Sequence, residues 1–188
     1  MKQKAILTLI ICSSSLLAGC NTTFNNPFNA HGPMVVSAKH SNSDIISDLI
    51  VLNKNEIAAS RLAESRTTNH EVRHLAKEMV HAHTKNLEQT LRLSKKIHAH
   101  QEVNNVSSHL QNEGAKEREI LKGLNGSAFD KHYVNAMIRD HEEALRLIDH
   151  TLMTHSTNPL LTKHLEATRQ HVMMHLEQFR AAHKQLRG

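Results

Sequence analysis

The stretch MVHAHTKN, from Met79 to Asn86, lies in the middle of a long segment with helical periodicity, and it decides how the rest of the chain is interpreted. At about 100° per residue, His83 falls near the centre of the apolar face of this segment, whereas His81 points to the opposite side. An imidazole therefore occupies a position that normally belongs to the core. The other residues of this face are Val72, Leu75, Ala76, Met79, Leu87 and Thr90.

Three further segments repeat this pattern of an apolar stripe with one polar residue near mid-length. The first is expected to begin at a cap formed by Ser43 or Asp44. Periodicity and capping residues together predict long helices over residues 43–66, 70–97, 127–152 and 158–186. The polar residues within about 40° of the centres of the four stripes are Glu56, His83, His141 and His175.

Four long helices without strand-like alternation predict an all-α fold, and a four-helix bundle is its natural architecture. The connection over residues 98–126 is too long for a simple hairpin, and a short helix is expected inside it from Ser107 to Lys122. We therefore predict a long crossover between the second and third long helices. With a rise of about 1.5 Å per residue, this topology places the four inward polar residues within about one helical turn of each other.

The four polar residues at this level have two interpretations. A carboxylate from Glu56 and imidazoles from His83, His141 and His175 could bind one zinc, manganese or iron ion. The same groups could instead satisfy one another in a metal-free hydrogen-bonded cluster, with the glutamate accepting from a histidine. His171 lies beside His175 on one flank of its helix and could extend this cluster. Asp130 and Tyr133, near the start of the third long helix, could hydrogen-bond the neighbouring helices, and Asn86 is a further candidate for the surrounding contacts.

Other motifs do not indicate an enzyme. Glu78 and His81 have the Glu-x-x-His spacing of di-iron bundles, but both lie more than about 100° from the stripe centre and should face solvent. Only Glu56 provides an inward carboxylate, so oxygen chemistry on two metal ions is not expected. No nucleophile elbow, phosphate loop or cysteine-histidine pair is present in the sequence.

The composition is unusual in its 17 histidines. Without Lys2 and Lys4, 21 basic residues face 18 acidic ones, which leaves a net charge of only +3. The chain has no Trp, one Tyr and four Phe, so it offers no aromatic platform for nucleic-acid bases. We expect no nucleic-acid partner.

The N-terminus resembles a bacterial lipoprotein signal. Two lysines precede a short apolar run, and Leu17-Ala-Gly-Cys20 follows it. The resemblance implies a signal peptide over residues 1–19, lipid on Cys20, and a membrane as a partner through that lipid. Residues 20–42 are expected to form a flexible tether and residues 43–188 the bundle domain. Because Asn21 is not the aspartate that retains lipoproteins in the inner membrane, we expect an outer-membrane address with the domain facing the periplasm.

Several motifs resemble the exported bacterial family called domain of unknown function 4142. They are MVHAHTKN, the stretch SAFDKHY from Ser127 to Tyr133 with His141 eight residues later, and the closing His175-Leu. The similarity covers about residues 44–186, and it implies a ferritin-like bundle. The helix that holds MVHAHTKN departs from the family pattern, because His81-x-His83 stands in place of an adjacent Asp-His pair. The matching positions are Glu56, His83, Asn86, Phe129, Asp130, Tyr133, His141 and His175.

The family resemblance implies no established activity. The sequence favours a lipid-anchored envelope protein that acts in binding or stress tolerance and is not an enzyme. A mononuclear metal-binding bundle is the first alternative, with one transition-metal ion as its cofactor. An envelope scaffold for protein partners, whose identity the sequence leaves open, is the second.

Overall fold

The computed structural model describes residues 40–187. All regular structure in this range is helical, which confirms the predicted all-α class. The signal peptide expected over residues 1–19, the lipid on Cys20 and the tether up to residue 39 lie outside the described residues. The helices are α1 (Asn42–Arg66), α2 (His70–Ile97), α3 (Asn105–Gly123), α4 (Gly126–Leu147), the π-helical η1 (Ile148–Leu152), α5 (Met153–His155) and α6 (Pro159–Gln185).

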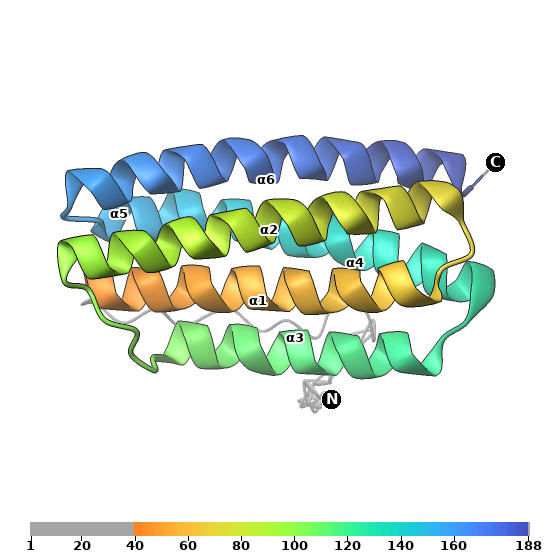
Figure 1. Cartoon of the computed structure of the whole chain (residues 1–188), viewed down its shortest axis with the longest axis horizontal. Coiled ribbons are helices and arrows are strands. Elements are labelled where there is room, and N and C mark those ends of the chain that lie inside the picture. Colours follow the sequence, from red (N-terminus) through yellow and green to blue (C-terminus); the bar gives the residue numbers. More distant parts are fainter. Residues whose placement is uncertain (1–39, 188) are drawn as a thin grey trace, which may run out of the picture. The chain divides into compact units, whose positions relative to one another are not determined.

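The long helices of the described part lie side by side (Figure 1). Helices α1 and α2 form an antiparallel pair, and α3 then runs back along α1. Helix α4 therefore begins at the end of the molecule where α1 finishes, and it runs in the same direction as α2. Helix α6 returns beside α4 and α2. The connection predicted as a crossover is thus itself a helix that extends along the bundle.

Helix α1 begins earlier than its expected cap at Ser43 or Asp44. The cap is Ser41, whose hydroxyl oxygen accepts from the backbone N–H of Asp44 at 3.1 Å. In return, the Asp44 carboxylate accepts from the backbone N–H of Ser41 at 2.8 Å, which completes a capping box. Asp44 is thus the acidic member of the box, and the helix starts at Asn42.

The crossover helix α3 is fixed to α1 at two levels. At its C-terminal end, the Arg66 guanidinium donates to the backbone carbonyls of Lys122 at 2.7 Å and Leu124 at 2.9 Å. Near mid-length, a Cβ on Gly114 would lie 2.3 Å from the side chain of Asn55, so only glycine allows this close approach. Asn55 uses the space to donate to the carbonyl of Leu110 at 2.7 Å.

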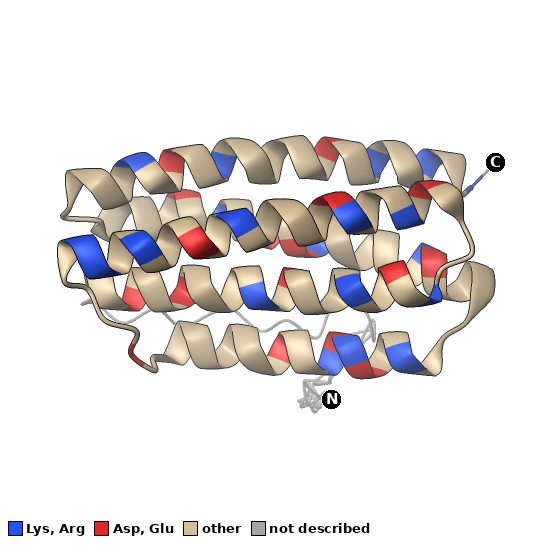
Figure 2. Cartoon of the chain, viewed as in Figure 1, with Lys and Arg blue, Asp and Glu red and all other residues tan. Residues whose placement is uncertain are grey.

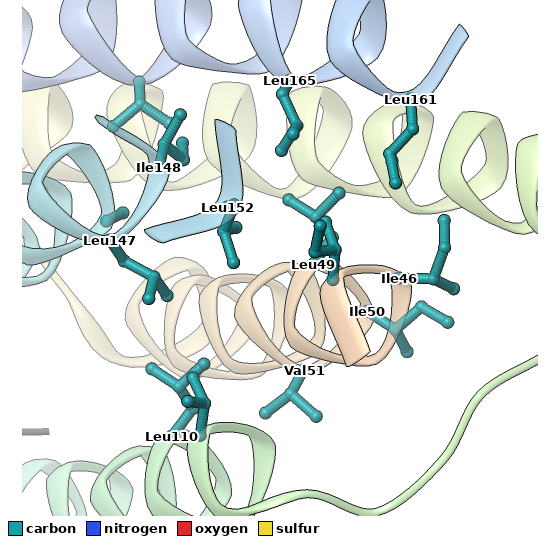
Figure 3. Close-up of a cluster of buried hydrophobic side chains, with 14 of the residues drawn as sticks. Ile46, Leu49, Ile50, Val51, Leu110, Leu147, Ile148, Leu152, Leu161 and Leu165 are labelled. Carbon is teal, nitrogen blue, oxygen red and sulfur yellow. The ribbon is translucent and has the colours of Figure 1, made fainter. Parts of the chain in front are cut away.

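The apolar core is divided into two clusters along the bundle. The cluster in Figure 3 includes Leu49, Ile148 and Leu165, while the other contains Met79 and Phe179. On α1, α2, α4 and α6 alike, the sequence between the two clusters holds one of the predicted inward polar residues. The polar residues thus occupy the layer between the two apolar clusters.

The outer faces carry the charged side chains. Figure 2 shows lysine, arginine, aspartate and glutamate spread along the helices with both signs interspersed. No lysine or arginine is buried within residues 40–187. In the same range, no helix has the length and apolar character needed to cross a membrane.

Candidate metal centre

Three histidines from three different helices meet in the layer between the two apolar clusters. His83 comes from α2, His141 from α4 and His175 from α6, and their exposed fractions are 9%, 2% and 4%. The ring centroids are 5.8 Å apart for His83 and His141, 5.3 Å for His83 and His175, and 5.6 Å for His141 and His175. One nitrogen atom from each ring lies within 4.8 Å of the other two.

Each ring has a buried nitrogen without a hydrogen-bond partner. These atoms are Nε2 of His83, Nε2 of His141 and Nδ1 of His175. In His141, Nδ1–H donates to the backbone carbonyl of Met137 at 2.8 Å. Since a carbonyl oxygen can only accept, the proton is on Nδ1, and Nε2 of the neutral ring carries a lone pair.

The same conclusion holds for His83, because a network of amide groups fixes its partner. Asn53 donates through Nδ2 to the backbone carbonyl of Leu49 at 2.7 Å and to Oδ1 of Asn86 at 3.0 Å. Its Oδ1 therefore faces His83 and accepts from Nδ1–H at 3.1 Å. Nδ2 of Asn86 donates to the hydroxyl of Thr168 at 2.9 Å, and that hydroxyl donates to the carbonyl of His164. Nε2 of His83 therefore carries a lone pair that can bind a metal ion.

Burial keeps all three imidazoles neutral. It lowers the pKa of His83 well below its usual value, and the neighbouring His141 and His175 act in the same direction. Burial and His175 lower the pKa of His141 to about 3, while burial and His171 lower the pKa of His175 to about 4. At neutral pH, three uncharged nitrogen ligands are therefore available without loss of a proton.

Glu56 lies beside this group but does not complete it. With Asn53, His83 and His141, it lines a cavity of about 20 Å³, which is room for one water molecule or ion. Its carboxyl is not among the ligand atoms that lie within 4.8 Å of one another, and Oε2 has no hydrogen-bond partner. Burial, followed by the charges of Asp140 and Glu117, raises its pKa well above the usual value.

The contacts expected of a metal-free cluster are absent from the described residues. In such a cluster the glutamate would accept from a histidine, yet Glu56 Oε2 and one nitrogen on each ring remain unpartnered. Buried polar atoms without partners are uncommon in native proteins. Four of them in one layer indicate a site that a bound water or ion would complete.

The other predicted site residues have different positions. Asn86 belongs to the amide network, and His171 is exposed one helical turn before His175. Asp130 accepts from the hydroxyl of Thr67 at 2.5 Å, in the turn between α1 and α2. Tyr133 bonds to Ser60 at 2.9 Å and packs its ring against Phe179. Asp130 and Tyr133 thus form hydrogen bonds with the α1–α2 turn and with α1, and not with the three histidines.

The sequence analysis missed Asn53. Its position three residues before Glu56 places it on the same side of α1, one turn away, and this spacing was the available indication. Glu78 and His81 lie away from the centre, as predicted. Glu78 pairs with His74 at 3.3 Å on the surface, and His81 is exposed.

A sequence profile described as Domain of unknown function (DUF4142) matches residues 30–182. The chain belongs to this family. That membership confirms the resemblance carried by the motifs around His83 and Tyr133. Among curated proteins, none matches the DUF4142 chain.

One solved structure has a similar fold. It is the crystal structure of the protein assigned as secreted protein DUF305 of Streptomyces coelicolor. The TM-score is 0.66 at 13% sequence identity, and the match covers 78% of the DUF4142 chain and 94% of the other. At this identity the similarity concerns the helical fold alone.

Proposed function

We propose that this domain binds a single transition-metal ion through His83, His141 and His175, with zinc as the first candidate. The observation that carries the proposal is the convergence of three neutral, buried imidazoles, each with a nitrogen that has no partner. Imidazole nitrogen suits zinc, copper, iron and nickel, whereas manganese prefers oxygen ligands. The chain offers no cysteine within residues 40–187.

The geometry requires only a small contraction to reach a bound state. Tetrahedral zinc with bonds of 2.0–2.1 Å places its nitrogen ligands about 3.3 Å apart. The three histidine nitrogens already lie within 4.8 Å of one another. Three protein ligands leave a fourth position for water or for Glu56, whose cavity adjoins His83 and His141.

The size of the cavity favours binding over catalysis. A volume of about 20 Å³ accommodates an ion or its water but no organic substrate. We therefore infer a metal-binding module whose role is in metal tolerance or buffering at the cell envelope. The lipoprotein-like sequence before Cys20 supports anchoring of the domain by lipid, with an outer-membrane, periplasm-facing location as the specific proposal. We also propose that the bundle is ferritin-like, as the direction of α3 between α2 and α4 suggests.

Metal analysis of the full-length protein, purified without a metal-affinity column, tests the proposal. We expect about one ion per chain, bound in competition with a chelator, and loss of that ion in His83→Ala and His175→Ala. His81→Ala is the matched control, because His81 is exposed on the same helix as His83. Helical circular dichroism should be unchanged in the control and verified in each variant.

The pH dependence separates the centre from adventitious binding by surface histidines. The lowered pKa values of His141 and His175 should preserve binding at pH 5.5, a pH at which an ordinary imidazole is mostly protonated. A folded protein that binds no ion, or that loses it equally in His81→Ala, would overturn the proposal.

A further inference from the structure

Three hydrogen bonds fix how α2 and α6 pass each other. Gln178 Nε2 donates to Glu78 at 3.3 Å, and Asn86 Nδ2 donates to Thr168 at 2.9 Å. The hydroxyl of Thr90 bonds to Nε2 of His164 at 2.8 Å. The helices are antiparallel, so residue 82, midway between 78 and 86, lies opposite residue 173, midway between 168 and 178. Ala82 therefore faces the helical turn that runs from His171 to His175.

At this level of the seam between α2 and α6, the residue of α2 that faces α6 is small. Ala82 is four residues from both Glu78 and Asn86, so it shares their face of α2, and its side chain is a single methyl group. Within the described chain, no hydrogen bond crosses the seam between the Glu78–Gln178 and Asn86–Thr168 pairs. At the level of the histidine centre, the seam is therefore bounded on the α2 side by a methyl group and is crossed by no hydrogen bond of the described residues.

His171 lies on the outer side of this gap. It is exposed, it precedes His175 by four residues on the same face of α6, and no hydrogen bond to a described residue occupies its ring. An imidazole in contact with water therefore stands one turn from His175, one of the proposed ligands.

We propose that the metal ion reaches the centre through the α2–α6 seam at Ala82, with His171 as the first protein ligand that it meets. This inference rests on the proposed metal-binding function and assigns an access route and an acquisition residue to that site. Transfer from His171 to His175 and His83 exchanges one imidazole ligand for another, so the ion keeps the same ligand type while it loses water.

On the opposite side of the centre lie Glu56 and the cavity that it lines. Beyond Glu56, α3 and α4 are joined by Glu117, which pairs with His132 at 2.7 Å and with Arg139 at 3.2 Å. Glu117 is therefore already held by two side chains of α4.

Rates of metal loading and release test this route on the full-length protein, with zinc and a fluorescent chelator in a stopped-flow instrument. Ala82→Leu should narrow the seam, and His171→Ala should remove the first ligand. We expect each to slow loading and release about tenfold, with the equilibrium Kd nearly unchanged, because an obstacle on the path affects both directions equally. His81→Ala, on the far side of α2, and Glu117→Gln, on the opposite side of the centre, are controls that should leave both rates unchanged.

The outcomes separate this inference from the proposed function. Wild-type protein that binds no zinc removes both. Tight binding by the wild type with unchanged rates in Ala82→Leu and His171→Ala overturns the route alone. Faster release from His171→Ala at an unchanged loading rate also overturns it, because His171 would then be an equilibrium ligand. Slower exchange in Glu117→Gln alone would place the route on the α3 side.

Discussion

Nδ1 of His83 lies 3.1 Å from Oδ1 of Asn53, and this one bond determines which nitrogen of the ring faces the centre. Asn53 cannot turn its amide around, because its Nδ2 is held by the backbone carbonyl of Leu49 and by Asn86. The orientation of a ligand on α2 is thus set by an amide on α1. A partner that fixes the tautomer of a metal-binding histidine is a recurrent element of metal sites.

The first prediction concerns this partner. Asn53→Leu retains the bulk of the side chain but removes the acceptor for Nδ1–H of His83. We expect the metal affinity to fall about 10- to 100-fold, since the ring loses its fixed tautomer and orientation. Competition with a chelator measures the affinity, and ¹⁵N chemical shifts of the imidazole report a mixture of tautomers in place of one.

Asn55→Leu is the matched control for this prediction. Asn55 lies on the same helix and also donates to a backbone carbonyl, but its partner is Leu110 on α3. Both substitutions should lower stability by about 1–3 kcal/mol, because each removes hydrogen bonds made by a buried or half-buried amide. Only Asn53→Leu should weaken metal binding. Equal loss of affinity in both variants would show that the effect is general destabilisation.

The contrast between Asn53 and the three histidines shows what the sequence can predict. An imidazole at the centre of an apolar stripe is visible as a break in the pattern, and the rise per residue brings His83, His141 and His175 to one level. Asn53 lies at the edge of its stripe, and its role depends on which acceptors its amide finds across the interface. Periodicity carries no information about that choice.

Glu56 illustrates the same limit at shorter range. Its Cα position was correctly placed inside the bundle, and the residue is 8% exposed. The position of its carboxyl group, at the end of a flexible side chain, depends on rotamers and on neighbouring charges such as Asp140. The start of α1 differs from the predicted cap at Ser43 or Asp44 for a related reason, because Asp44 is the acidic residue of a box closed by Ser41.

The second prediction concerns pH and a buried carboxyl far from the histidines. Asp48 is fully buried, accepts from Asn104 at 3.0 Å and lies 2.7 Å from Nε2 of His40. Burial raises its pKa to about 6, against the opposing effects of Asn104 and His40. The folded state therefore binds a proton that the unfolded state has lost, and the stabilising effect of this proton, complete below about pH 4, disappears as the pH rises to 6.

Asp48→Asn should remove this dependence. Two pKa units correspond to about 3 kcal/mol, so the unfolding free energy of the variant should gain about that much relative to wild type between pH 4 and pH 7. Urea unfolding in chelator at several pH values measures the difference, in which the titrating groups that do not contact Asp48 cancel. A difference that does not change with pH would contradict the raised pKa.

Asp44→Asn provides a control of opposite sign. Partial burial acts against the shift, yet the backbone N–H and hydroxyl of Ser41, together with His40 and Asn104, lower the pKa of Asp44. Its ionised form therefore stabilises the folded state above the unfolded pKa, and this contribution is lost as the pH falls. The unfolding free energy of Asp44→Asn should fall furthest below that of wild type at neutral pH. At the same pH, the unfolding free energy of Asp48→Asn should have gained most relative to wild type.

The third prediction tests how the crossover is held. Arg66 donates to the carbonyls of Lys122 and Leu124, and its guanidinium lies 5.6 Å from the ring centre of Phe129. Arg66→Ala leaves the carbonyls at the end of α3 without their donor, so we expect a loss of about 2 kcal/mol and faster amide exchange in α3 than in α2. Arg61→Ala, at an exposed position of the same helix, should cost little.

Arg66→Lys should restore only part of the stability, since one ammonium cannot span the acceptors that the planar guanidinium joins. Full rescue by lysine would show that charge near the end of α3, and not the fork of hydrogen bonds, holds the crossover in place.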